Sequence, residues 1–446
     1  MRVWIMELNN NFQLSCVKLF EEIFSDEPHH ALNFFLHVHS FLSDLRCLHC
    51  CLYMKESGHV ELADFALSKV IKERDLGVSG YYELAIIKER LDALPEAMAL
   101  IRKVLTADPE HDRALLRRAI IMVKLGMREP ASAAIEDIPL SNNFDLNEKT
   151  TLAAFNRTSD FWHAQMELFT ETPLNFWEVG EAVEKALVEQ KPFCLLRLGD
   201  GEGAFLMPDH TEDLMSLATV ARRYFAYRWF GDNFESALPV LMSLSGKLKE
   251  IASNADIVAV PNIDWCRYEW ANGNFRTLAG CLSSRQCIIN TDGLLAESGV
   301  ALDLTHGSVL SRLIQKAETV CLVTCHTELA QKLNHALGSN KVESIIIPPA
   351  HSDLNLSKLS IDRNHVDVFN DTMNLIKAYS QSRLFLIGAG YLGKFYTHQA
   401  SMMGAVALDV GSVLDGIMGL QTRPNFEGID LPAKFWGAFM NDQEAA

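Results

Sequence analysis

Short apolar runs in the second part of the chain constrain its fold more than any other feature. The runs are rich in Val, Ile and Leu, and amphipathic segments such as residues 181–189 and 329–337 lie between them. This alternation is typical of a mostly parallel sheet covered by helices. We therefore predict an α/β domain with a Rossmann-like sheet, whose functional groups follow the carboxyl ends of the strands. The predicted strands are residues 193–196, 257–260, 287–289, 320–323, 344–347, 384–387 and 406–408.

The first part of the chain contains a repeat. Ala63, Ala97 and Ala131 lie at the same point of three similar helical stretches, 34 residues apart, and this is the period of the tetratricopeptide repeat. Small residues at such positions let paired helices approach, and their apolar neighbours form a stacked seam. A plain helical bundle with a coincidental spacing is the alternative, and both interpretations predict an all-α domain.

The polar, turn-like residues 141–147 have the composition of a linker between two domains. We place the helical-repeat domain at residues 1–150 and the α/β domain at residues 151–446. The repeat region contains no group of residues that we interpret as catalytic.

Charge and hydropathy exclude several classes of protein. The formal net charge of −17 opposes binding to nucleic acid or anionic lipid, because both require a basic surface. No apolar run reaches the roughly 18 residues that a membrane-spanning helix needs. Residues 1–20 lack the pattern of a secretory signal, so we expect a cytoplasmic protein.

The ten cysteines lie mostly in apolar stretches and form no disulfide framework. One cluster contains Cys47, His49, Cys50 and Cys51. Structural zinc usually needs a second pair of ligands at a defined distance. We interpret the cluster as thiols that pack a helix, and zinc binding is the alternative.

A glycine-rich acidic motif follows the first predicted strand. Residues 197–203 read Arg-Leu-Gly-Asp-Gly-Glu-Gly. Asp200 and Glu202 are two residues apart, so in an extended segment both carboxylates point the same way. Two such carboxylates, with phosphates completing the shell, are how Mg²⁺ or Mn²⁺ is usually held by a nucleotide enzyme. A common turn in which Asp caps backbone groups is the alternative.

Other groups of the motif suit a phosphate. Gly199 and Gly201 leave backbone N–H groups unshielded, so a ligand can approach the chain closely. Arg197 is near enough in sequence to bind a diphosphate or to orient a carboxylate. We therefore predict a divalent metal held by Asp200 and Glu202 beside a phosphate-binding loop.

Residues 196–202 resemble the Arg-x-Gly-Asp-Gly-Glu signature of the GT-D-type glycosyltransferases, in which Asp-x-Glu serves the metal and the sugar nucleotide. Residues 386–390 and 404–411 are similar to the last strand–helix–strand unit of that family. The resemblance covers roughly residues 161–419, and Ser412 stands where the family often has His. It implies transfer of a sugar from a nucleotide-sugar donor of the UDP-glucose type.

A competing fingerprint lies near the end of the chain. Gly388, Gly390 and Gly393 form G-x-G-x-x-G after a predicted strand, and Asp409 ends the next strand 21 residues after Gly388, which is the pattern of an NAD-dependent oxidoreductase. Only 37 residues follow Asp409, too few for the rest of a Rossmann domain that starts here. We interpret Gly388, Gly390 and Asp409 as part of the donor site, where a glycine turn and a helix N-terminus receive phosphate.

Transfer of a sugar also needs a base that takes the acceptor proton. Asp264 and His326 are the preferred candidates because they follow the most apolar strands. The aromatic and basic residues 222–229 predict either an acceptor groove or an amphipathic helix with an aromatic inner face. Further strand-end candidates are Glu269, Asp292, Glu328, His351 and Asp353.

The sequence as a whole predicts a metal-assisted glycosyltransferase. Its repeat domain would hold a protein or glycan acceptor, or would mediate assembly of a homo-oligomer. A scaffold that binds a nucleotide without turnover and an NAD-dependent oxidoreductase are the alternatives.

Overall fold

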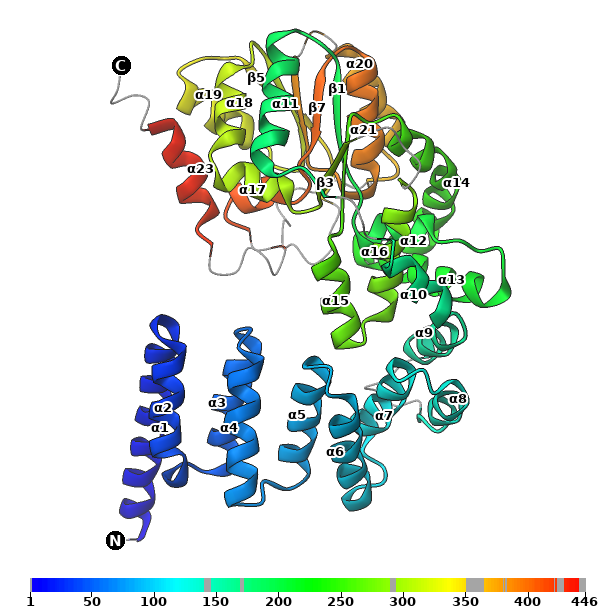
Figure 1. Cartoon of the computed structure of the whole chain (residues 1–446). Coiled ribbons are helices and arrows are strands. Elements are labelled where there is room, and N and C mark those ends of the chain that lie inside the picture. Colours follow the sequence, from blue (N-terminus) through cyan, green and yellow to red (C-terminus); the bar gives the residue numbers. More distant parts are fainter. Residues whose placement is uncertain are drawn as a thin grey trace. The chain divides into compact units, whose positions relative to one another are not determined.

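A computed structural model of the chain describes residues 2–139, 146–168, 172–288, 294–349, 365–379, 383–420 and 429–440, with Gln381 and Thr422 (Figure 1). The chain forms two compact units. Unit 1 contains Met1–Ser159 and Tyr268–Asn274, and unit 2 contains Asp160–Arg267 and Phe275–Ala446.

Unit 1 consists of helices that pack as successive antiparallel pairs (Figure 1). Ala63, Ala97 and Ala131 are fully buried, in α4, α6 and α8 respectively. Each lies where a helix contacts its neighbour, which explains their regular spacing. The helices are α1 (Arg2–Asp26), α2 (Pro28–Val38), η1 (His39–Phe41), α3 (Asp44–Glu56), α4 (Val60–Glu73), α5 (Gly77–Arg90), α6 (Leu94–Ala107), α7 (Asp112–Lys124), α8 (Arg128–Glu136) and α9 (Leu146–Arg157).

The cysteine cluster packs helix α3 into this unit. Cys47, Cys50 and Cys51 are fully buried, and burial raises the pKa of Cys47 to about 11. His49 instead lies at the surface, where its Nε2 is 2.7 Å from Glu21 Oε1. The interpretation as helix-packing thiols therefore fits the structure, because the imidazole and the thiols do not converge.

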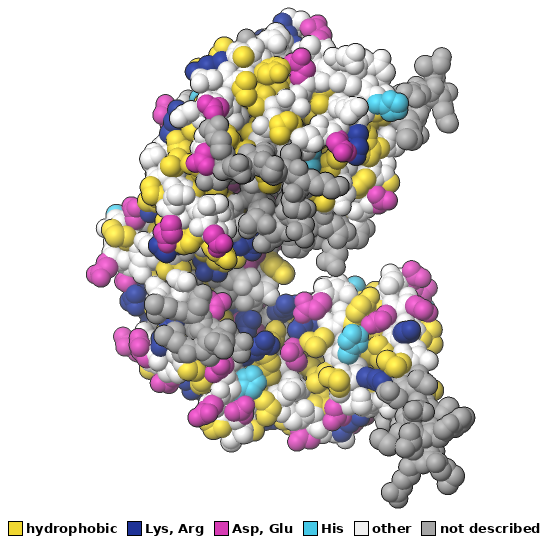
Figure 2. Space-filling view, turned by 180° about the vertical axis from the view of Figure 1, so that it is seen from behind, with side chains coloured by type: hydrophobic (Ala, Val, Ile, Leu, Met, Phe, Trp, Pro, Cys, Tyr) yellow, Lys and Arg dark blue, Asp and Glu magenta, His cyan; other side chains and the backbone are white. Residues whose placement is uncertain are grey.

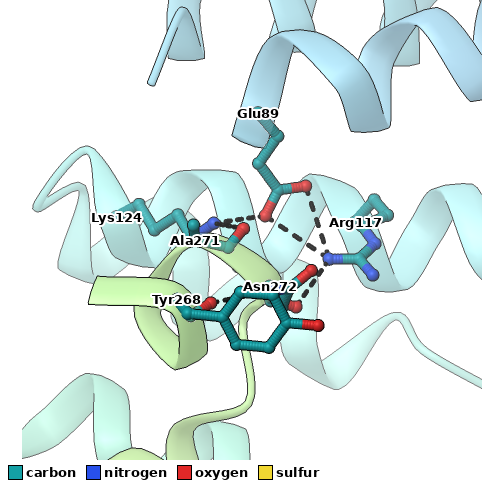
Figure 3. Close-up of polar contacts among 6 residues, drawn as sticks. All are labelled: Glu89, Arg117, Lys124, Tyr268, Ala271 and Asn272. Atoms are coloured by element: carbon teal, nitrogen blue, oxygen red, sulfur yellow. Dashed lines mark hydrogen bonds and ion pairs between the residues drawn. The ribbon is translucent and has the colours of Figure 1, made fainter. Parts of the chain in front are cut away.

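A buried ion cluster in unit 1 binds the end of helix α15 (Ile263–Asn272) (Figure 3). Lys124 Nζ lies 2.5 Å from Glu89 Oε1 and donates to the carbonyl of Ala271 at 2.8 Å. Arg117 donates to the carbonyl of Asn272 at 3.0 Å. The last carbonyls of a helix have no partner within the helix and carry a partial negative charge, so the two cations satisfy them.

Unit 2 is built on a seven-stranded sheet in which every pair of neighbours is parallel. The strand order is β3-β2-β1-β7-β6-β4-β5. This confirms the predicted α/β fold with a helical N-terminal part. The strands are β1 (Phe193–Arg197), β2 (Ile257–Val260), β3 (Leu294–Glu297), β4 (Val320–Thr324), β5 (Val342–Ile346), β6 (Leu384–Ile387) and β7 (Val406–Asp409).

Helices cover both faces of the sheet (Figure 1). Alternate strand residues such as Leu195, Leu322 and Leu408 pack against α11, α17, α18 and α19, while α21 packs on β1, β6 and β7 from the other face. The helices of this unit, besides the first half of α15, are α10 (Ser159–Met166), α11 (Phe176–Val188), α12 (Asp200–Leu206), α13 (Glu212–Phe230), η2 (Gly231–Asn233), α14 (Phe234–Ser253), α16 (Phe275–Gln286), α17 (Val300–His306), α18 (Val309–Lys316), α19 (Leu329–Leu337), α20 (Phe369–Ala378), α21 (Gly390–Met402), α22 (Val413–Ile417) and α23 (Leu431–Met440).

Two predicted strands differ from the structure, and in both cases the difference concerns an edge of the sheet. The prediction at residues 287–289 is wrong for its described part, because the N–H groups of Cys287 and Ile288 continue the bonding of helix α16. The strand at this edge of the sheet is β3, whose first and last residues are exposed. The other edge strand, β5, begins two residues before the predicted run and is buried only in part.

Acidic and basic side chains are interspersed over the face of the molecule that Figure 2 shows. Among the described residues, no helix has both the length and the apolar character needed to cross a bilayer.

Candidate active site at the carboxyl edge of the sheet

The loops that follow β1, β6 and β7 lie next to one another at the carboxyl edge of the sheet. Strand β7 pairs with β1 on one side and with β6 on the other. Gly388 and Gly411 approach so closely that a Cβ on Gly388 would lie 2.9 Å from the carbonyl oxygen of Gly411. The predicted glycine motifs at the two ends of the domain therefore belong to one site. In particular, the G-x-G-x-x-G turn lies in the last β6–α21–β7 unit of a sheet that begins upstream.

Lys394 on α21 connects the three loops. Its Nζ lies 2.9 Å from Glu202 Oε1 and 2.8 Å from Asp409 Oδ2, and it donates to the carbonyl of Gly390 at 3.1 Å. Lys394 is buried, as are both carboxylates. Burial alone would lower the pKa of Lys394, but Asp409 and Glu202 outweigh burial and raise it, so the side chain is an ammonium ion.

Glu202 points into the protein. Its Oε2 accepts a hydrogen bond from the backbone N–H of Gly199 at 2.8 Å, and its Oε1 contacts Lys394. Burial would raise the pKa of Glu202, but Lys394 and that N–H group hold the pKa below its ordinary value. The carboxylate is therefore charged, and both of its oxygens have protein partners.

The predicted extended arrangement of Asp200 and Glu202 is wrong. Asp200 is the first residue of helix α12, and Gly199 is its N-cap. A Glu at the third position of a helix reaches back to the N-cap N–H group, as in one half of a capping box. The two carboxylates of the motif are consequently not a pair on one side of a strand; Asp200 is partly exposed, whereas Glu202 is buried.

Arg197 lies at the end of β1 and presents its guanidinium at the edge of the sheet. Its Nε donates to the carbonyl of Ser298 at 2.8 Å, and its backbone N–H bonds Asp409 Oδ2 at 3.3 Å. The guanidinium lies over Gly411, where a Cβ would be 2.4 Å from one terminal nitrogen. Its two terminal nitrogens form no hydrogen bond or ion pair with any residue that the structure describes, and the residue is partly exposed.

The glycines of the motif have two different roles. Gly199 is partly exposed at the helix N-cap, but its N–H group is not open to a ligand as expected, because it donates to Glu202. The expectation that Gly201 bares the backbone to a ligand is wrong, because a Cβ there would lie 2.4 Å from the Trp229 ring. Gly203 contacts α16 in the same way, since a Cβ would lie 1.7 Å from the carbonyl oxygen of Gly280. These two glycines allow close packing of helices.

His326 follows β4 and forms an ion pair. Its Nε2 lies 2.8 Å from Asp415 Oδ1. Burial would lower the pKa of His326, but the bond to Asp415 outweighs it and raises this pKa to about 9. A protonated imidazole cannot accept a proton at neutral pH, so the geometry favours a cationic role over the predicted role as base.

The same two residues belong to the one group of metal-ligand atoms found in the described part of the chain. Cys325 Sγ, a His326 ring nitrogen and an Asp415 oxygen lie within 4.8 Å of one another. His326 Nε2 and Asp415 Oδ1 are already bonded to each other at 2.8 Å.

The other candidate bases differ in their surroundings. Asp264 is the second residue of α15, which follows β2, and its exposed carboxylate pairs with Arg267 at 3.2 Å. Glu269 is buried and accepts from Asn274 at 2.7 Å, whereas Glu328 pairs with Lys332 at the surface. The candidates that lie outside the described residues are Asp292, His351 and Asp353.

Residues 222–229 lie within helix α13, as one of their two interpretations predicts. Trp229 is buried and stacks on Phe205 of the motif helix at 6.0 Å. Arg222 is buried and donates to the carbonyls of Ala204 and Met207. The inner face of this helix thus supports the motif, which agrees with the amphipathic interpretation.

The sequence reasoning missed Lys394. A signal was available, since Lys394 is the only Asp, Glu, Lys or Arg residue from Leu384 to Leu408. A lone charge within a buried helix needs a buried partner, and Asp409 at the end of the next strand is one.

Comparison with known proteins adds two family matches. The model of the GT-D fold-like domain matches residues 174–417, and a tetratricopeptide repeat model matches residues 91–152. A solved structure described as a selenomethionine-substituted domain of unknown function 1792 is similar, with 12% identity and a TM-score of 0.35. That similarity covers 56% of this chain and 82% of the other. Among curated proteins, none is similar enough to this chain to count as a match.

Proposed function

This chain belongs to the GT-D fold-like domain family, and we propose from that premise that it transfers a sugar from a nucleotide-sugar donor to an acceptor. The family match and the repeat match confirm the two resemblances predicted from the sequence. In such a reaction the bond between the anomeric carbon and the donor phosphate breaks. A bond to the acceptor forms, and the acceptor proton passes to a base.

The observation that supports the proposal is the way in which the Arg197 side chain is held at the edge of the sheet. Its Nε bond and the space over Gly411 hold the side chain, while its terminal N–H groups have no partner among the described residues. A guanidinium recognises phosphate oxygens through paired N–H donors. Arg197 would thus bind the diphosphate of the donor and stabilise the negative charge that develops when the bond to the sugar breaks.

A divalent metal held by Asp200 and Glu202 does not fit this arrangement. Both oxygens of Glu202 already accept hydrogen bonds from within the protein, and the ammonium of Lys394 lies between Glu202 and Asp409. We therefore assign no step of the reaction to a metal at this pair.

His326 and Asp264, the two predicted bases, follow other strands of the sheet than Arg197 does. Strand β4 is three positions from β1 in the sheet, a separation of about 14 Å at the usual strand spacing. His326 would therefore contact a part of the donor or acceptor other than the phosphate held by Arg197. Asp264 follows β2, the neighbour of β1, and remains our proposed base because its carboxylate is exposed.

The helical-repeat unit would bind the acceptor, which we propose to be a protein or a glycan carried by one. Repeat helices of this class expose extended surfaces that suit proteins. Assembly into a homo-oligomer through the same helices is the alternative role. The donor that we propose to test first is UDP-glucose, which the family resemblance implies.

The test is release of UDP from a panel of UDP-sugars by the full-length chain, with and without added acceptor candidates. We expect release from at least one UDP-sugar, and a loss of at least about 100-fold in Arg197→Gln if one transition-state charge contact is removed. The surface variant Lys247→Gln serves as the control. UDP binding without release would favour the nucleotide-binding scaffold, and binding of NAD(H) alone would favour an oxidoreductase.

A further inference from the structure

We infer that Lys394 is a built-in cation that takes the place of a divalent metal, so that the site binds a nucleoside diphosphate without metal. The inference rests on the proposed function, because it concerns how the same site tolerates an anionic ligand. Because Lys394 is buried, we assign it a positioning role.

The contacts of Lys394 resemble those of a bound cation. Its three ammonium hydrogens match three acceptors, which are oxygens of Glu202, Asp409 and Gly390 at 2.9, 2.8 and 3.1 Å. These acceptors come from α12, from the end of β7 and from the first turn of α21. A metal bridging strand-end loops would connect the same elements.

The burial of the cluster leaves little access for a second cation. Lys394 is 4% exposed, Glu202 is 7% exposed and Asp409 is fully buried. A hydrated divalent ion would have to lose its water and displace the ammonium, because two cations among the same oxygens repel each other. The three side chains are therefore complete as they stand, apart from Asp409 Oδ1, which has no hydrogen-bond partner among the described residues.

The charge balance explains why the site needs a cation at all. Two carboxylates close to a diphosphate would repel it, and the chain as a whole carries a net charge of −17. Lys394 neutralises one of the two charges, and the guanidinium of Arg197 lies beside Asp409, over Gly411. Arg197 is then the group that contacts the phosphates, since its terminal nitrogens have no other partner in the part of the chain that the structure describes.

Isothermal titration of the full-length wild-type chain with UDP tests the inference, once in excess EDTA and once in Mn²⁺. We expect dissociation constants that differ by less than fivefold. An affinity that rises fivefold or more with Mn²⁺ would overturn the inference while leaving the proposed function intact. Absence of UDP binding under both conditions would refute the proposed function itself.

A variant supplies a second measurement, whose result would not change if Lys394 had a purely structural role. In Lys394→Met the carboxylates of Glu202 and Asp409 lose their cation, so we expect this protein to gain a Mn²⁺ site detectable by electron paramagnetic resonance. Lys247→Met, which removes an exposed lysine from α14, is the matched control. Equal Mn²⁺ affinity in folded Lys394→Met and wild type would contradict the inference. If Lys394→Met does not fold, the wild-type titration decides.

Discussion

Replacing Gly203 by Ala tests how tightly the motif helix is packed. A Cβ at this position would lie 1.7 Å from the carbonyl oxygen of Gly280 and 2.7 Å from Ser284 Oγ. Real Cβ atoms essentially never come closer than 3.0 Å to such atoms, so α12 and α16 must separate by at least about 1.3 Å. The obstacle is backbone, which cannot rotate away as a side chain can.

The cost follows from two contributions. Overpacking of this kind destabilises proteins by about 1–3 kcal/mol. Separation would also break the hydrogen bond from Ser284 Oγ to the carbonyl of Gly199, now 2.6 Å, which adds about 1 kcal/mol. We therefore expect Gly203→Ala to lower the free energy of unfolding of unit 2 by about 2–4 kcal/mol, and to weaken nucleotide binding because Gly199 moves.

Gly246→Ala is the matched control. Gly246 lies within helix α14 and is exposed, and a Cβ added to it would have no neighbouring atom within 4 Å. Alanine is the better helix former by about 1 kcal/mol, so this change should stabilise the protein. Urea unfolding followed by tryptophan fluorescence compares the two variants. Equal stability of Gly203→Ala and wild type would refute the packing argument.

Three further predictions concern other parts of the chain. Gly411→Ala should weaken UDP binding, because the added methyl group displaces the guanidinium of Arg197. The φ of +53° at this position also costs an alanine about 1 kcal/mol of backbone strain. Titration with UDP measures the effect, and an unchanged affinity would contradict the prediction. Lys124→Met should destabilise unit 1 by about 1.5–3 kcal/mol in urea unfolding, because Glu89 stays buried and keeps only its longer contact with Arg117 at 3.4 Å, and a loss below about 1 kcal/mol would argue against a buried pair. His326 has a folded pKa of about 9, above its ordinary 6.5, so its ion pair stabilises the fold fully below pH 6.5 and is lost as pH rises through 9. Asp415→Asn should therefore cost stability at pH 6 but much less at pH 10, and an equal cost at both pH values would refute the assignment.

The sequence predicted the interior of the sheet better than its edges. The apolar runs at residues 193–196, 320–323 and 384–387 belong to central strands that are buried on both faces, which makes their pattern continuous. Strand β3 has exposed residues and a Glu, so its pattern resembles a loop. Cys287 and Ile288 instead continue a buried helix, a context that periodicity alone does not distinguish.

The sequence reasoning named some residues of the candidate site but missed Lys394, and it did not predict how the residues pair. Arg197 and Asp409 lie at neighbouring strand ends, as expected from motifs at the two ends of the domain. The partner of Glu202 is Lys394, 192 residues later in the chain, and no local pattern encodes such a pairing. The inward turn of Glu202 could have been predicted, because its spacing from Gly199 is that of a helix cap.

The proposed binding of a nucleotide at this edge of the sheet depends most directly on Arg197, the group that we propose to hold the donor diphosphate. Titration of UDP into wild type and Arg197→Gln, with unfolding curves recorded for both, measures this contact. Hydrogen bonds from a charged group contribute about 1.5–3 kcal/mol, so we expect the variant to bind UDP about 10–150 times more weakly with unchanged stability. Equal UDP affinity in the two proteins would contradict the placement of the nucleotide beside β1.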